Sequence, residues 1–241
     1  MRSYKRYTRR KRLLKHIVVV ALVFILGLVL LRAVSYIAIQ GEIPMINSFN
    51  LFRREADTSF GWNLILVNDD YRIPRNYEVE LTELSNGEKV DSRIYPQLQQ
   101  MFDAARAEEL ELFVREGYRT TQDQKNIMNE RIQKYQDEGY SRWEAKERAE
   151  EYVAEPGTSE HELGIAVDIN ADTSKCSADA VYTWLANNAY KYGFIKRYPD
   201  DKTEITGVNN EPWHYRYVGV DSAIEMQEKG LCLEEYIESL R

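Results

Sequence analysis

Residues 159–168 read SEHELGIAVD, and they say more about the fold than any other part of the chain. Residues 164–169 (GIAVDI) are a nearly continuous apolar run of strand length, which is typical of a strand buried on both faces. The residues before them, 155–162 (EPGTSEHE), predict a loop. A turn at Gly164 would bring His161, on the loop, toward Asp168, near the end of the strand.

His214 is the other histidine with acidic neighbours, in Glu211-Pro212-Trp213-His214 at the start of a predicted strand. Zinc favours imidazole nitrogen and carboxylate oxygen, and a catalytic site uses three protein ligands. His161, Asp168 and His214 supply such a set. Glu211 then remains as a carboxylate close to the metal, which suits the general base of a metallohydrolase. Spacing alone also fits histidines that are hydrogen-bonded structural residues, so it leaves both interpretations open.

The other elements predict an α+β domain with a small, mainly antiparallel sheet flanked by helices. The predicted helices cover 95–109, a segment from Thr121 as N-cap to about 138, a segment from the capping box of Ser141 and Glu144 to about 153, 178–192 closed by Gly193, and a last region from Asp221 to 240. The predicted strands cover 63–67, 77–81, 110–115 and 213–218. The polar helix after Ser141 is either a surface element or a lid over the site.

The N-terminus predicts one transmembrane helix. Residues 1–32 carry nine Lys and Arg and no acidic residue, and residues 17–39 are apolar apart from Arg32 and a few weakly polar positions. About 20 such residues cross a bilayer as a helix, and a basic flank stays in the cytoplasm. We therefore expect a cytoplasmic basic tail (1–16), a membrane anchor (17–39), a linker (40–61) and an extracytoplasmic domain (62–241). A cleaved signal peptide is the alternative, and it places the domain outside the cytoplasm as well.

Charge and cysteine content limit the partners. The whole chain has 39 acidic against 32 basic residues, and because nine basic and no acidic residues lie in 1–32, residues 33–241 have 39 acidic against 23 basic. An acidic domain is a poor match for phosphate groups, so no nucleic acid partner is expected. Cys176 and Cys232 form either a disulfide or two free thiols. We expect a monomer that meets the membrane only through its N-terminal helix.

Three motifs together carry a resemblance to a known family. Residues 159–168 closely resemble the S-x-H-x-x-G-x-A-x-D motif of the VanY/VanX-type zinc D-Ala peptidases, and Glu211–His214 resembles their E-x-W-H motif. Residues 117–124 (GYRTTQDQ) are similar to the family's G-Y-R-[ST]-x-x-x-Q element. The motifs occur in the family's order. The resemblance covers roughly residues 62–240 and implies the Hedgehog/D-Ala-D-Ala peptidase type of fold.

The resemblance also implies roles for individual residues. His161, Asp168 and His214 would hold one Zn2+ per chain, and Glu211 would be the general base. Arg119 would stabilise the oxyanion that forms at the scissile carbonyl, because a guanidinium is always charged. The polar groups that meet the terminal carboxylate of the substrate would be Ser159 and Gln124. Tyr118 and Trp213 would form walls of the cleft, although either fits a core position equally well.

The implied function is removal of the C-terminal D-Ala from peptidoglycan stem peptides outside the cell. A D-Ala-D-Ala carboxypeptidase is the preferred interpretation, because it is the commoner activity in the family. An L,D-carboxypeptidase that trims tetrapeptide stems is the alternative. A dipeptidase for free D-Ala-D-Ala fits less well, since such enzymes work in the cytoplasm. A non-catalytic wall-binding module of the same fold, or a membrane scaffold, leaves the complete set of ligands, base and arginine unexplained.

Overall fold

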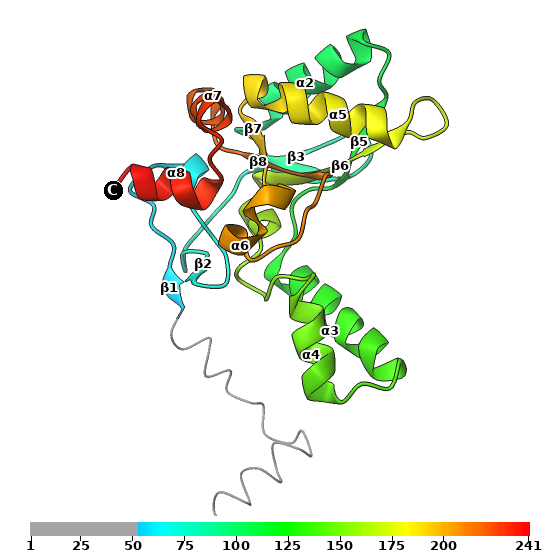
Figure 1. Ribbon diagram of the computed structural model, residues 1–241, viewed down its shortest axis with the longest axis vertical. Coiled ribbons are helices and arrows are strands. Elements are labelled where there is room, and N and C mark those ends of the chain that lie inside the picture. Colours follow the sequence, from blue (N-terminus) through cyan, green and yellow to red (C-terminus); the bar gives the residue numbers. More distant parts are fainter. Residues whose placement is uncertain (1–52) are drawn as a thin grey trace, which may run out of the picture. The chain divides into compact units, whose positions relative to one another are not determined.

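A four-stranded antiparallel sheet lies at the centre of the computed structural model, which describes residues 53–241 (Figure 1). The strands follow the order β5-β6-β8-β7, and each neighbouring pair is antiparallel. Their bounds are Leu112–Glu116 (β5), Ala166–Ala171 (β6), His214–Tyr217 (β8) and Phe194–Lys196 (β7). The prediction of a mixed fold with a small antiparallel sheet and flanking helices is confirmed for these residues.

One face of the sheet packs on two helices, α2 (Tyr95–Ala107) and α5 (Ala178–Asn188), which lie side by side over it in Figure 1. Val167 and Ile169 of β6 belong to the same buried cluster as residues of both helices, among them Leu98, Met101, Val181 and Leu185. Side chains alternate across a strand. Asp168, between Val167 and Ile169, therefore points to the opposite face of the sheet.

Two helices, α3 (Thr121–Asp137) and α4 (Arg142–Glu150), pack against each other and share a small cluster of their own around Met128, Ala149 and Val153. The capping box predicted at Ser141 and Glu144 is confirmed. The predicted N-cap at Thr121 is wrong by one residue, because the Thr120 hydroxyl accepts from the Asp123 amide and the Thr120 amide donates to the Asp123 carboxylate. Both threonines suit a cap, so composition did not separate them.

The C-terminal region forms two helices, α7 (Val220–Lys229) and α8 (Leu233–Ser239), where one helical region was predicted. Gly230, with φ 64°, ends α7 in the left-handed conformation and reverses the chain. Asp221 lies in the first turn of α7, and Gly219 is its N-cap. Both helices contribute to a second buried cluster that includes Ile195 of β7 and Val218.

The start of the domain differs from the prediction. Residues 53–61 were assigned to the linker, but Ala56 is buried and β1 (Arg54–Glu55) pairs in parallel with β2 (Tyr71–Arg72). Strands of two residues have no hydrophobic periodicity for a sequence pattern to detect. The apolar run at 63–67 contains a 3-10 helix, η1 (Trp62–Leu64), and not a strand. Short apolar runs do not distinguish these structures.

The remaining elements are short. β3 (Leu81–Glu83), which overlaps the strand predicted at 77–81 only at Leu81, forms a hairpin with β4 (Lys89–Asp91) around the turn at Asn86 and Gly87. The single-turn helices are η2 (Glu160–Leu163), η3 (Ala189–Tyr192), η4 (Asp200–Lys202) and α6 (Thr203–Thr206). The last two lie within the polar segment 199–210.

Two further predictions concern the anchor and the cysteines. Within residues 53–241 no helix is both long enough and apolar enough to cross a membrane. The predicted tail, anchor and first part of the linker lie outside the described residues, so the anchor stays a prediction. Cys176 and Cys232 are both free thiols, which decides between the two alternatives that the sequence left open.

Candidate metal centre

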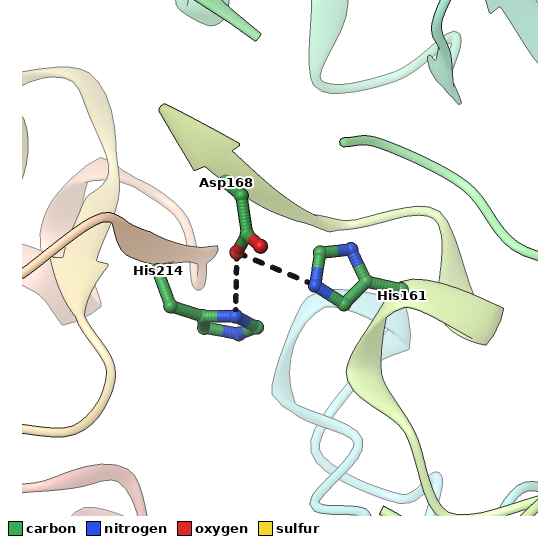
Figure 2. Close-up of side chains that lie close together, drawn as sticks. All are labelled: His161, Asp168 and His214. Atoms are coloured by element: carbon green, nitrogen blue, oxygen red, sulfur yellow. Dashed lines mark hydrogen bonds and ion pairs between the residues drawn. The ribbon is translucent and has the colours of Figure 1, made fainter. Parts of the chain in front are cut away.

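His161, Asp168 and His214 meet at one point on the face of the sheet opposite α2 and α5. One ligand atom from each side chain lies within 4.8 Å of the other two. Asp168 Oδ1 is 3.4 Å from His161 Nε2 and 3.0 Å from His214 Nδ1, and Figure 2 shows both rings directed at this carboxylate. The sequence-predicted ligand set is therefore assembled in space.

The sheet register places two of these ligands. Asp168 of β6 and His214 of β8 are direct partners across the antiparallel pair, so their side chains leave the same face next to each other. His161 reaches the same point from η2. Gly164 ends η2 with φ 73°, and its carbonyl accepts the Asp91 amide at 2.8 Å. A left-handed residue here turns the chain from η2 into β6, which suits glycine.

A backbone carbonyl sets the proton on the His161 ring. Nδ1–H donates to Gly117 O at 2.8 Å, which leaves the lone pair of Nε2 facing Asp168. A Cβ on Gly117 would lie 2.2 Å from Lys89 O, so only glycine brings this carbonyl into place. Burial lowers the pKa of His161, and the charge of Arg119 lowers it further. The ring is thus neutral, as a metal ligand must be.

His214 presents its other nitrogen to the site. Its Nδ1 faces Asp168, and its Nε2 lies 3.5 Å from Glu160 Oε2. Burial opposes a charge on this ring, but the contacts with Asp168 and Glu160 outweigh it and raise the pKa of His214 to about 9. Burial likewise opposes the Asp168 anion, yet the two histidines hold the pKa of that carboxyl well below its usual range. An ionised carboxylate between two convergent imidazoles fits a zinc ion.

Glu211 lies beside the three ligands without being one of them. Its Oε2 is 3.8 Å from His214 Nδ1, and its backbone amide donates to Tyr198 O at 3.1 Å. Burial raises the pKa of Glu211, the His214 charge opposes this, and the Asp168 charge adds to it. A raised carboxyl pKa brings proton uptake closer to neutral pH, as a general base that later acts as an acid requires.

Arg119 is held from three directions. Its Nε forms an ion pair with Glu116 at 2.7 Å, and its Nη1 donates to Gln124 Oε1 at 2.7 Å. Its backbone amide donates to the carbonyl of His161 at 3.2 Å. Glu116 and Gln124 therefore hold the guanidinium in a defined orientation, and its charge acts on both His161 and Glu211, as a group that stabilises negative charge requires.

The predicted substrate-binding residues have different surroundings. Gln124 is 1% exposed, and its amide is bonded at both ends: Oε1 accepts from Arg119 and Nε2 donates to Ala154 O at 2.6 Å. Gln124 therefore supports Arg119 in this structure, and its contact with substrate stays a prediction. Ser159 is buried at the start of η2, Trp213 is 36% exposed and Tyr118 is partly buried. Their contacts with substrate stay predictions.

Sequence reasoning missed a buried ionic cluster behind His214. Glu160 Oε1 lies 2.8 Å from Arg197 Nε and 3.0 Å from Arg216 Nη1, and all three side chains are buried. Arg197 also binds Glu234 of α8 through two hydrogen bonds of 2.9 and 2.5 Å. Arginines are mostly exposed, so nothing in the sequence separates these two from surface residues. Tyr198 was missed too, and its ring centroid lies 5.0 Å from that of His214.

The chain matches known proteins over most of this domain. The family model described as VanY, D-alanyl-D-alanine carboxypeptidase, matches residues 87–220. A D-alanyl-D-alanine carboxypeptidase of Enterococcus faecalis is 54% identical over 196 residues, which cover 81% of this chain and 73% of the relative.

Solved structures give the same result. VanYB in complex with D-alanine-D-alanine has 56% identity and a TM-score of 0.72, and the match covers 75% of this chain and 99% of that one. A mutant of a vancomycin resistance D,D-pentapeptidase VanY, in complex with Zn(II), has 57% identity and a TM-score of 0.70. This match covers 73% of this chain and 99% of that one.

Proposed function

This chain belongs to the VanY family of D-alanyl-D-alanine carboxypeptidases, and from that membership we propose that it is a zinc-dependent enzyme that removes the C-terminal D-Ala from peptidoglycan stem peptides ending in D-Ala-D-Ala. The observation that carries the proposal is the convergence of His161, Asp168 and His214 within 4.8 Å. Glu211 and Arg119 stand next to this cluster, as amide hydrolysis requires.

Zinc held by these three residues supplies Lewis-acid chemistry, which activates water and polarises a carbonyl group. Glu211 takes the proton that water loses and returns it to the nitrogen of the departing D-Ala. Its position 3.8 Å from His214 Nδ1 and its raised pKa support this role. Arg119 stabilises the negative charge that develops on the oxygen of the scissile carbonyl. Glu116 and Gln124 hold its guanidinium in place for that purpose.

A carboxypeptidase must also recognise the end of the chain. Ser159, two residues before His161, is the polar residue that we assign to the terminal carboxylate. Tyr118 and the half-exposed Trp213 adjoin Arg119 and His214 in sequence, and we assign them to the walls of the cleft. Replacing Ser159 by Ala should raise KM more than it lowers kcat. An unchanged KM would remove Ser159 from the substrate site.

The test of the function uses two substrates. Residues 42–241, purified with zinc, are incubated separately with a pentapeptide stem ending in D-Ala-D-Ala and with a tetrapeptide stem ending in one D-Ala. Mass spectrometry follows both. Loss of one alanine from the pentapeptide alone supports the proposal, and loss from the tetrapeptide alone identifies an L,D-carboxypeptidase. If neither is trimmed while zinc is bound, the proposed function is wrong.

We further propose that the chain is a monomer anchored in the cell membrane by residues 17–39, with its catalytic domain outside the cytoplasm. The basic residues before the apolar run support this orientation. Protease added to intact cells without their wall should remove the domain and leave a short membrane-bound fragment. Protection of the domain would place it in the cytoplasm. Light scattering measures the molar mass of the purified chain in solution, and a mass equal to two copies would exclude a monomer.

A further inference from the structure

Glu160 lies next to one metal ligand in the sequence but contacts the other. It directly precedes His161, yet its Oε2 lies 3.5 Å from Nε2 of His214. Glu160 is 3% exposed. Within residues 53–241 neither of these two buried atoms has a hydrogen-bond partner in good geometry. Buried polar atoms are usually hydrogen-bonded, and a small rotation of either side chain would bring these two into a hydrogen bond.

The orientation of His214 requires an acceptor on this side. Its Nδ1 faces Asp168 and the ligand cluster. As a zinc ligand, His214 is a neutral imidazole with one N–H, so a lone pair on Nδ1 demands a proton on Nε2. That proton points at Glu160. His161 uses the opposite arrangement, with Nδ1–H on the Gly117 carbonyl and Nε2 toward the site. The two histidines thus rely on different acceptors, a neutral carbonyl and a carboxylate.

The surroundings of Glu160 keep its carboxylate fixed. Oε1 lies between Arg197 Nε and Arg216 Nη1, which leaves Oε2 for His214. Arg197 is in turn tied to Glu234 of α8. Arg216 donates from Nη2 to the carbonyl of Ile65 at 2.8 Å. Both arginines therefore hold Oε1, and the bond from Arg216 to Ile65 ties this side of the carboxylate to the start of the domain independently of Glu234.

We propose that Glu160 is a positioning residue of the metal centre, whose Oε2 accepts the Nε2 proton of His214 and thereby presents Nδ1 to the zinc ion. The inference rests on the zinc site of the proposed function. A carboxylate behind a ligating histidine fixes its tautomer and makes it a stronger ligand, and losing such a partner typically weakens metal binding about 10- to 100-fold. Glu160 touches neither water nor substrate in this scheme.

The direct test is the protonation pattern of the two rings in the wild-type protein. The chain has three histidines, so 15N-histidine labelling of the full-length, zinc-loaded chain in detergent gives six ring nitrogens to assign by NMR. The expected result is a proton on Nε2 of His214 and on Nδ1 of His161. A proton on Nδ1 of His214, with Nε2 bound to zinc, would overturn the proposal.

A pair of matched variants tests the energetic consequence. Glu160→Gln removes the carboxylate behind His214, whereas Glu234→Gln removes a carboxylate from the same arginine without touching His214. Chelator competition should show zinc affinity reduced about 10- to 100-fold in Glu160→Gln and within about threefold of wild type in Glu234→Gln. An equal loss of zinc affinity in both variants would mean that Glu160 acts only as a member of a structural ion cluster, and it would overturn the proposal. If Glu160→Gln does not fold, the ring protonation in the wild-type chain decides.

These measurements do not depend on peptidase activity. A chain that binds zinc with the expected ring protonation, but trims no stem peptide, would contradict the proposed function and leave the role of Glu160 standing.

Discussion

Asp168 and His214 are direct partners across two antiparallel strands, and their side chains meet at 3.0 Å on the same face of the sheet. This pairing makes the strand register part of the metal site. A shift of either strand by one residue would turn its ligand to the opposite face. His161 completes the set from a separate turn.

His214→Ala should therefore abolish stoichiometric zinc binding while the domain still folds. Two ligands remain, which is one fewer than catalytic zinc sites use. Metal analysis after gel filtration measures the effect, and circular dichroism checks the fold. His16→Ala is the matched control, since His16 lies in the basic N-terminal segment. Full zinc occupancy in His214→Ala would contradict the assigned ligand set.

Glu211→Ala should keep zinc at wild-type stoichiometry and lower kcat on the pentapeptide about 10²- to 10⁴-fold, the usual contribution of a positioned general base. The reason is that Glu211 lies beside the ligands without completing the set. Glu204→Ala, which removes an exposed carboxylate from α6, should leave both zinc and kcat unchanged. Near-normal turnover in Glu211→Ala would assign the proton transfer to another group.

Motifs with local periodicity or capping chemistry could be predicted from the sequence. The helix expected at 95–109 is found as Tyr95–Ala107, and the capping box at Ser141 and Glu144 lies where it was predicted. The three ligands were predicted from their residue types, and the resemblance of the surrounding motifs to a known family favoured a metal site over structural histidines. Their convergence depends on the turn at Gly164, which was predicted and is present, and on the pairing of β6 with β8.

Features that depend on distant parts of the chain could not be predicted. The buried arginines Arg197 and Arg216 are stable only because Glu160 and Glu234 meet them in the folded state. Sequence patterns do not encode such partners. Gln124 was assigned to the substrate because its spacing fits the motif, but spacing does not reveal that its amide is already bonded at both ends.

Gln124→Ala tests which role its amide has. Gln124 holds Arg119 Nη1 at 2.7 Å, so its loss should lower kcat about 10-fold with zinc unchanged, while Arg119→Ala should cost about 10²- to 10³-fold. If Gln124 acts through Arg119, removing Gln124 in the Arg119→Ala background should cost little more. If the decrease in kcat of the double variant equals the product of the two single decreases, Gln124 contacts the substrate independently, as the sequence pattern predicted.

Glu155 provides a prediction for stability at acid pH. Its carboxylate lies 3.0 Å from Lys146 of α4 and 2.6 Å from Arg53. Burial alone would raise the pKa of Glu155, but hydrogen bonds from Glu150, Lys146 and Arg53 outweigh it and lower the pKa to about 2 from an ordinary 4.5. A carboxyl whose pKa is depressed in the folded state stabilises it above the unfolded pKa, and the contribution is lost as pH falls through the folded value.

At pH 7, Glu155→Gln should therefore unfold at a lower temperature than the wild type, with a free energy of unfolding that is smaller by about 1–2 kcal/mol after allowance for solvent screening. This difference in the free energy of unfolding should decrease between pH 4.5 and 2 and disappear below that range. Calorimetry of both metal-free proteins across this range isolates the effect, because no zinc is released and the other carboxylates are common to the pair. Lys146 belongs to α4. If the difference in the free energy of unfolding stayed constant with pH, Glu155 would hold this helix by packing and not by its charge.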